Sequence, residues 1–305
     1  MPLKANNILN QKNLMVSVCI QTYNQSKYIR QCIESIDSQK INFDFNVLVG
    51  EDDSNDGTRA LCKELLMIYP NKIKLFLHKR ENVIYINDKP TGRYNFLHNL
   101  KYSDGKYIAF CEGDDYWIYD HKLQKQVDIL EANPNFSICF SRVQIVDADG
   151  QEKEISNQDT PEVTTYKDLL KGNYLNTPSV MIRRDALPSP LPEWLKKMPM
   201  GDWPLLLLAS LNGDIKMFPE PMAAYRIHDN GIWSTNTSFQ KLLVGFKSRR
   251  ILLENLPAKA HPILLHSIVG NALYISSHYR ENGQRLLGLK YFCFYLYYRL
   301  RKSFK

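Results

Sequence analysis

The stretch Tyr107-Ile108-Ala109-Phe110-Cys111-Glu112-Gly113-Asp114-Asp115-Tyr116-Trp117 joins a run of apolar residues to three carboxylates within four positions. The apolar run predicts a buried strand, and the carboxylates then follow its carboxyl end. In an open α/β sheet, ligands bind at that edge. Neighbouring carboxylates repel one another unless a counter-charge is present, and oxygen ligands suit Mg²⁺ or Mn²⁺. The stretch therefore indicates either a divalent-metal site or a solvated acidic turn.

The residues before this stretch alternate between strand and helix patterns. We expect six elements, with strands at 14–21, 45–49 and 73–78 and helices at 28–39, 58–69 and 92–100. Such alternation is typical of an open, mainly parallel Rossmann-like sheet flanked by helices. Right-handed crossovers place all strand-to-helix turns at one edge of such a sheet. The acidic turn at 50–58 is therefore expected to face the same crevice as Glu112, Asp114 and Asp115.

The residues after this stretch continue the α/β pattern and then change character. We expect a helix at 122–133, a strand at 136–146, a tight turn at 147–150, a polar loop at 151–165, a helix at 166–171, a strand at 178–183, an ordered loop at 188–204, a helix at 204–211 and short strands at 215–218 and 222–225. Three helices, at 239–256, 262–280 and 283–305, follow. We therefore divide the chain into a domain at 1–236 and a helical C-terminal extension at 237–305.

The last predicted helix mixes aromatic with basic residues, which suits a helix lying at a membrane surface. Packing of its rings on the other two helices explains them equally well. The formal net charge is +7, with the basic excess at the C-terminal end. The six cysteines form no Cys-x-x-Cys pair, which fits a reducing cytosol. We expect no signal peptide, no membrane span and no nucleic-acid partner.

Two further polar residues, outside the acidic turns, are candidate functional residues. Asp202 stands at the start of a predicted helix, where it acts either as a cap or as a functional acid. His228 lies among polar, turn-forming residues, so we do not expect it in the packed core.

Several of these motifs, in this order, resemble the family 2 glycosyltransferases, and the similarity covers about residues 14–235. The matching motifs are Val16–Asn24, Gly50–Thr58, Cys111–Trp117, Gly201–Trp203 and Tyr225–His228. The resemblance implies a GT-A-like fold. It also implies transfer of a sugar, with inversion, from a nucleotide-diphosphate sugar to a hydroxyl acceptor, with Mn²⁺ or Mg²⁺ as cofactor.

The resemblance assigns a role to each motif. It implies nucleotide contacts from the first two turns and from the start of the metal motif: Thr22, Tyr23, Asn24, Glu51, Asp52, Asp53, Glu112 and Gly113. It implies a metal site of Asp114, with His228 as a second ligand and Asp115 in support. It makes Asp202 the general base that takes the acceptor's proton, and it places Trp203 and Trp233 beside the donor and acceptor sugars. The extra acid in Glu51-Asp52-Asp53 leaves open which of the three contacts the base.

The implied donor is a UDP-sugar, and the implied acceptor is a glycan or a lipid-linked glycan in surface polysaccharide or glycoconjugate synthesis. We expect a cytoplasmic protein that contacts the inner face of the cell membrane through its C-terminal helix. Two alternatives remain open. One is a non-catalytic carbohydrate-binding or scaffold subunit. The other is a sugar nucleotidyltransferase, which is disfavoured because Thr22-Tyr23-Asn24-Gln25-Ser26 has neither the glycine nor the arginine of a phosphate loop.

Overall fold

The computed structural model describes residues 14–303, except residues 87, 230 and 232. The chain forms two compact units. The first comprises Met1–Thr164, Tyr174–Pro190 and Leu208–Ile227, and the second comprises Thr165–Asn173, Leu191–Leu207 and His228–Lys305. The division of the chain at residue 236 stays a prediction. The second unit differs from it by including residues 165–173, 191–207 and 228–236.

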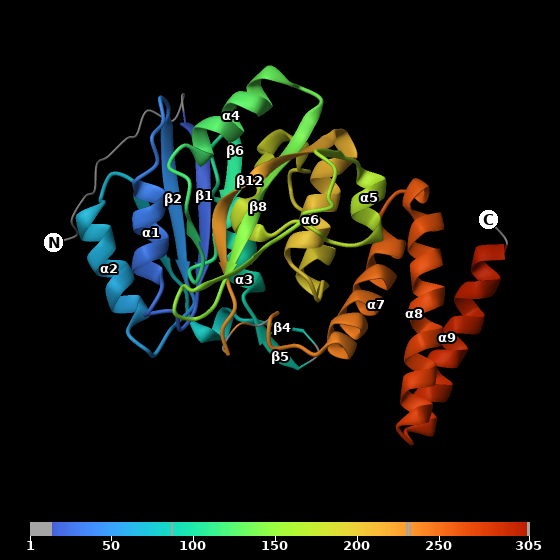
Figure 1. The fold of residues 1–305 in the computed structure, drawn as a ribbon. Helices are drawn as coiled ribbons and strands as arrows, with labels where there is room; N and C mark the ends of the chain where they lie inside the picture. The colour runs from blue at the N-terminus through green and yellow to red at the C-terminus, as the bar shows by residue number, and fades with distance from the viewer. Residues whose placement is uncertain (1–13, 87, 230, 232, 304–305) are drawn as a thin grey trace. The chain divides into compact units, whose positions relative to one another are not determined.

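The first unit is built on a mixed sheet with the strand order β10-β12-β8-β11-β6-β1-β2-β3 (Figure 1). The strands on this path are β1 (Leu14–Thr22), β2 (Asp44–Glu51), β3 (Ile73–Leu77), β6 (Tyr107–Phe110), β8 (Phe136–Val146), β10 (Val163–Thr164), β11 (Met181–Arg183) and β12 (Asp214–Arg226). The neighbours β6, β1, β2 and β3 run parallel. The short strand β11 is antiparallel to both of its neighbours, while β8 and β12 are parallel to each other. The expected α/β class with a mainly parallel open sheet is confirmed.

Helices cover both faces of the parallel part of this sheet. These helices are α1 (Ile29–Asp37), α2 (Thr58–Ile68), α3 (Arg93–Lys101) and α4 (Lys122–Ala132). Helices α1, α2 and α4 share a core cluster with one face of β1, which contributes Val16, Val18 and Ile20. The opposite face of β1 meets the end of α3, where the Cys19 thiol lies 3.2 Å from the Ser103 hydroxyl. The sheet is thus buried on both sides, which explains why β1 is almost entirely apolar.

The second unit is helical. Its helices are α5 (Tyr166–Lys171), the first residues of α6 (Asp202–Ala209), α7 (Ser238–Asn255), α8 (His261–Glu281) and α9 (Arg285–Ser303). In Figure 1, α7, α8 and α9 lie side by side, with α9 at the outer edge of this helical layer. The three C-terminal helices are therefore confirmed to within two residues at each described end. None of the helices in the described part of the chain is both long and apolar enough to cross a bilayer.

Short elements account for most differences from the sequence prediction. The polar segment at 151–165 is not only a loop, because it contains β9 (Glu152–Ile155) and β10, which pair with β8 and β12. The two strands expected at 215–218 and 222–225 form the single strand β12, whose register on β8 shifts around Pro221. Proline cannot donate to a ladder, so the irregularity falls where the prolines stand. Further segments that were not predicted as regular structure include β4 (Ile84–Ile86), β5 (Lys89–Thr91), β7 (Tyr116–Trp117) and the 3₁₀ turn η5 (Glu193–Lys197).

Candidate nucleotide-binding site

The carboxyl ends of β1, β2 and β6 meet at one edge of the sheet in the first unit. The Asp52 amide donates to the Thr22 carbonyl at 3.1 Å, and the Gly113 amide donates to the Gln21 carbonyl at 3.0 Å. A Cβ atom at Gly113 would lie 2.8 Å from the Thr22 Cβ, closer than real contacts allow, so only glycine fits. Both acidic turns therefore lie beside the end of β1, as the sequence predicts.

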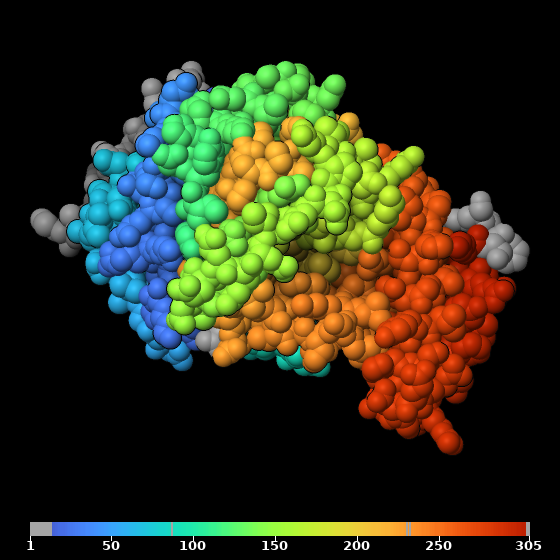
Figure 2. Space-filling model, viewed as in Figure 1, coloured from blue at the N-terminus to red at the C-terminus, as the bar shows by residue number. Residues whose placement is uncertain are grey.

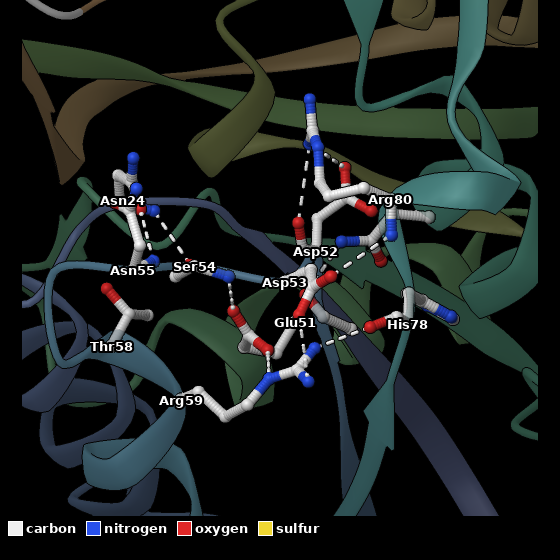
Figure 3. Close-up of polar contacts among 12 residues, drawn as sticks. Asn24, Glu51, Asp52, Asp53, Ser54, Asn55, Thr58, Arg59, His78 and Arg80 are labelled. Carbon is white, nitrogen blue, oxygen red and sulfur yellow. Dashed lines mark hydrogen bonds and ion pairs between the residues drawn. The ribbon is translucent and has the colours of Figure 1, made fainter.

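The turn after β2 is held by an internal ion pair (Figure 3). Glu51 is fully buried; one carboxylate oxygen pairs with the Arg59 Nε, and the other accepts a 2.7 Å bond from the Ser54 amide. Arg59 also pairs with Asp53 at 3.0 Å and donates to the His78 carbonyl. Both carboxylate oxygens of Glu51 thus bond to other groups of the protein, and these contacts fix the shape of the turn.

Asp52 is the acid of this turn that keeps an unused oxygen. Its side chain is buried, and its Oδ2 lies 3.5 Å from the Arg80 guanidinium (Figure 3). Its Oδ1 is buried and has no hydrogen-bond partner among the described residues. Burial raises the pKa of this carboxyl, while the charge of Arg80 acts in the opposite direction. An oriented, buried acceptor without a partner is costly unless a ligand supplies a donor.

Arg80 joins Asp52 to the turn after β1. Its guanidinium carbon lies 4.5 Å from the centre of the Tyr23 ring, a cation–π distance, and its Nη1 also donates to the Asp52 carbonyl at 3.3 Å. The Arg80 amide donates to Asp53 Oδ2 at 3.2 Å. Arg80 was not among the predicted site residues. It lies in the 3₁₀ turn η2 (Arg80–Asn82), where no periodic pattern singles it out.

The turn after β1 is fastened to the turn after β2 by side chain to backbone bonds. The Asn24 amide donates to the Ser54 hydroxyl at 2.9 Å, and the Asn24 side-chain oxygen accepts from the Asn55 amide at 3.0 Å (Figure 3). Asn24 has a φ of 52°, a conformation in which asparagine is one of the tolerated residues. Thr22 lies beside it with a buried hydroxyl that has no partner among the described residues. Thr22, Tyr23 and Asn24 therefore lie together beside the turn after β2.

The acidic turn after β6 presents its three carboxylates differently. Asp115 is buried, and its Oδ1 accepts a 2.8 Å bond from the Arg226 amide. Burial, together with the charges of Asp114 and Glu112, raises the pKa of Asp115 well above its ordinary value. Asp114 and Glu112 are only half-buried. Asp114 and Glu112 are thus the partly exposed acids of this turn, with the Oε2 atom of Glu112 itself buried, while Asp115 faces the protein.

Arg226, at the end of β12, holds this turn in place. Its guanidinium donates to the Asp114 carbonyl at 2.9 Å, to the Ala148 carbonyl at 3.0 Å and to the Gln31 side chain at 2.8 Å. It also lies over the Tyr28 ring, 4.5 Å from its centre. Arg226 stands within the Tyr225–His228 motif, and no role was predicted for it from the sequence. Its buried position identifies it as the residue that ties β12 to the acidic turn.

The chemistry of this turn suits a divalent cation. Carboxylate oxygens are the ligands that Mg²⁺ and Mn²⁺ prefer, and a positive charge would offset the repulsion among Glu112, Asp114 and Asp115, which adds to burial in raising the pKa of Asp115. Among the described residues, however, no three His, Cys, Asp or Glu side chains are grouped as a ready metal site. A cation at Asp114 therefore needs further oxygen ligands, such as those of a bound diphosphate.

The remaining predicted residues belong to the second unit. Asp202 is the first residue of α6, and its Oδ2 accepts a 2.7 Å bond from the Asn173 side chain. Trp203 is only 1% exposed, and its indole nitrogen donates to the Leu169 carbonyl at 2.9 Å. That burial leaves no ring face for a sugar, so we do not include Trp203 in the proposed subsite. His228 is half-buried, and Trp233 is exposed with the Lys241 ammonium 5.6 Å from its ring centre.

Comparison with known sequences agrees with the fold and the motifs. Residues 17–188, more than half of the chain, match the family described as Glycosyl transferase family 2. The chain therefore belongs to this family of glycosyltransferases.

Relatives in bacteria and a solved structure extend the similarity. The chain is 32% identical to an uncharacterised protein of Mycobacterium bovis, Mb1547, over 72% of this chain and 60% of that protein. It is 28% identical to the Escherichia coli UDP-Glc:alpha-D-GlcNAc-diphosphoundecaprenol beta-1,3-glucosyltransferase WfgD, over 57% of this chain and 62% of that enzyme. The chain thus spans about 60% of the length of these two relatives. Residues 1–349 of TarS from S. aureus, solved with UDP-GlcNAc, superpose with a TM-score of 0.59, 16% identity and coverage of 95% and 93% of the two chains.

Proposed function

We propose that this chain transfers a sugar, with inversion, from a nucleoside-diphosphate sugar to a hydroxyl group of a glycan or a lipid-linked glycan. The observation that carries the proposal is Asp52, a buried carboxylate with an unused oxygen at the end of β2. A pyrimidine base offers an N–H donor of the kind this oxygen lacks. A UDP-sugar is the donor we favour, because WfgD is named for UDP-Glc and TarS was solved with UDP-GlcNAc.

In this proposal, the turns after β1 and β2 receive the nucleoside. Asp52 accepts the base N–H, and the buried hydroxyl of Thr22 hydrogen-bonds to the base or ribose. Tyr23 and Asn24 line the site, with Arg80 stacked on the Tyr23 ring. Glu51 acts indirectly, because both of its oxygens bond within the turn. Asp53, paired with Arg59, completes the turn rather than contacting the base.

The turn after β6 then receives the diphosphate. Gly113 allows close approach because a side chain there would strike Thr22 and Gln25. Asp114 is the proposed ligand of Mn²⁺ or Mg²⁺, with Glu112 beside the ribose or the metal, and Asp115 orients the turn through the Arg226 amide. We retain His228 as the second proposed metal ligand. Bound there, a divalent cation would neutralise negative charge on the departing diphosphate.

Asp202 is the proposed general base. It takes the proton of the acceptor hydroxyl as the new bond to the sugar C1 forms and the bond from C1 to the diphosphate breaks, which inverts the anomeric centre. The exposed ring of Trp233 is the proposed wall of the sugar subsite, because aromatic faces pack on the C–H faces of sugars.

Titration of the protein with UDP tests the proposal directly. We expect binding that Mn²⁺ or Mg²⁺ strengthens and that Asp52→Asn weakens by about 10- to 100-fold, because a hydrogen bond to a charged group is lost. Asp53→Asn is the matched control in the same turn. Failure of UDP to bind with or without metal would refute a UDP-sugar donor, and a stronger effect of Asp53→Asn would move the base contact to that residue. A panel of nucleotide sugars then identifies the donor by its hydrolysis or transfer.

The proposed setting is the assembly of surface polysaccharide or glycoconjugate at the cytoplasmic face of the cell membrane. The name of WfgD includes a diphosphoundecaprenol acceptor, which is lipid-linked. An enzyme that uses such an acceptor works at a membrane surface, so peripheral contact through the C-terminal helix forms part of this proposal.

A further inference from the structure

Helix α9 has two different faces, and one of them is used inside the second unit. The rings of Tyr291, Phe294 and Tyr298 point towards α7. The Tyr291 ring lies 5.4 Å from the Phe246 ring, and the Arg250 Nε donates to the Tyr298 hydroxyl at 2.9 Å. Tyr291 and Tyr298 are buried. These aromatic residues are therefore explained by packing within the unit.

The opposite face of α9 is apolar and exposed. We define the α9 stripe as the exposed residues on this face: Leu286, Leu289, Cys293, Leu296 and Leu300. They follow the alternating three- and four-residue spacing that keeps side chains on one side of a helix, in a band about 100° wide. Leu286 is 84% exposed, and α9 lies at the outer edge of the helical layer, at the red end of the space-filling view (Figure 2). Among the described residues, no other segment covers these leucines.

Basic residues border the α9 stripe on both sides. Arg285 and Arg299 lie along one border and Lys290 along the other, and all three are exposed. The helix contains five Lys or Arg residues and no Asp or Glu. Pairing the stripe with a second copy of itself would bring these like charges together, which disfavours a self-paired coiled coil. The charges instead favour an anionic surface.

We propose that the α9 stripe docks on the surface of an anionic lipid bilayer. The leucines enter the boundary between head groups and acyl chains, and the bordering basic residues contact lipid phosphates. The helix lies in the membrane plane, because its inner face stays packed on α7 and α8. The proposal deepens the membrane contact suggested above, but it does not depend on donor chemistry, because UDP binding is measured without lipid.

Cys293 supplies the probe for a test in the full chain. It is the exposed cysteine within the stripe, and the other five cysteines are buried, so a thiol-reactive, environment-sensitive fluorophore labels it selectively. We expect its emission to rise and shift to the blue on adding phosphatidylglycerol vesicles, but not phosphatidylcholine vesicles. Lipids that carry a quencher near the head group should quench it.

Variants of the unlabelled protein, measured by vesicle co-sedimentation, separate the two parts of the surface. Leu296→Gln with Leu300→Gln should lower partitioning at least about 10-fold, because two leucines no longer enter the apolar layer. Arg285→Gln, Lys290→Gln and Arg299→Gln together should lower it about 100-fold at low salt, since each basic residue near an anionic membrane is worth about fivefold. Met67→Gln on α2, at a residue 80% exposed, is the matched control and should have no effect.

Three results would overturn the proposal. The first is the absence of any response to phosphatidylglycerol vesicles by protein that binds UDP normally. The second is equal binding to phosphatidylglycerol and phosphatidylcholine vesicles, which would show that the negative charge of the lipid plays no part in binding. The third is a lipid-independent change in Cys293 emission that follows protein concentration and coincides with a dimer in sedimentation, which would assign the stripe to a second copy. Circular dichroism and thermal melts of each variant confirm that the helices still fold.

Discussion

Replacing Lys122 by methionine is expected to change how the stability of this protein depends on pH. Lys122, the first residue of α4, is fully buried, with its ammonium 4.0 Å from the centre of the Trp117 ring and 2.9 Å from the Gln126 side-chain oxygen. No carboxylate forms an ion pair with it among the described residues. Burial lowers the pKa of Lys122 to about 7. In the unfolded chain, the same lysine titrates near its ordinary value of about 10.4.

The sign and size of this effect of Lys122 on stability follow from proton linkage. Between these two pKa values, the unfolded chain binds more protons than the folded chain, so this lysine makes stability rise with pH. A full proton difference is worth about 1.4 kcal/mol per pH unit. The folded proton is half lost at pH 7 and almost wholly lost at pH 9. Between pH 7 and pH 9, the free energy of unfolding of the wild type should therefore rise by about 2 kcal/mol relative to that of Lys122→Met. Below pH 7, this difference in free energy should become constant.

Guanidinium unfolding at pH 6, 7, 8 and 9 measures this difference. Lys125→Met is the matched control, because it removes the same charge from the same helix at a partly exposed position that pairs with Glu220. Subtracting its curve from that of Lys122→Met isolates the effect of burial. Parallel pH profiles for the wild type and Lys122→Met would refute the reasoning, because they would mean that Lys122 keeps its proton in the fold.

Three further predictions concern the site. Asp202→Asn should lower kcat by about 10²- to 10⁴-fold because the general base is lost, while the melting temperature stays unchanged because asparagine suits the start of a helix as well as aspartate does; an unchanged kcat would leave Asp202 with only a structural role at the start of α6. Arg80→Lys should weaken UDP binding in calorimetry more than Lys79→Arg does, because lysine keeps the charge but loses the planar group stacked on Tyr23; equal affinities would contradict a role in the nucleoside site. Arg226→Met should cost about 3 kcal/mol in chemical unfolding and lower kcat, since the hydrogen bonds of the buried guanidinium to two backbone carbonyls and to Gln31 are lost; a loss of stability with full activity would show that Arg226 does not shape the acidic turn.

The parallel half of the fold could be predicted because its signals are local. The apolar run of β1 and the helical spacing of Ile29, Cys32, Ile33 and Ile36 are complete within their own segments, and all four of these helix residues are buried. The handedness of the crossovers then places the acidic turns at one edge without any knowledge of distant contacts.

The residues that the sequence could not reveal depend on partners far away in the chain. Lysine is normally exposed, so nothing in the pattern of α4 marks Lys122 as buried. Its burial depends on Trp117 in β7, a two-residue strand that carries no periodic signal and forms by pairing with Ala223 and Ala224 of β12. Arg80 meets Tyr23 for a similar reason, because its position follows from the pairing of β2 with β3. The bounds of such short strands come from tertiary pairing rather than from propensity.

The acidic turn after β6 shows how tertiary contacts distinguish residues that the sequence leaves equivalent. The sequence does not distinguish the three carboxylates within these four positions. In the structure, residues 112–115 form a turn in which the Asp115 amide donates to the Glu112 carbonyl at 3.0 Å, and this turn directs their side chains differently. Asp115 points inward, where the Arg226 amide donates to it, and burial together with the nearby charges of Asp114 and Glu112 raises its pKa. Asp114 and Glu112 are left half-buried beside Gly113, where backbone can approach closely. A cation or a diphosphate reaching this edge would therefore meet Asp114 and Glu112 first, while Asp115 and Arg226 fix where those two carboxylates stand.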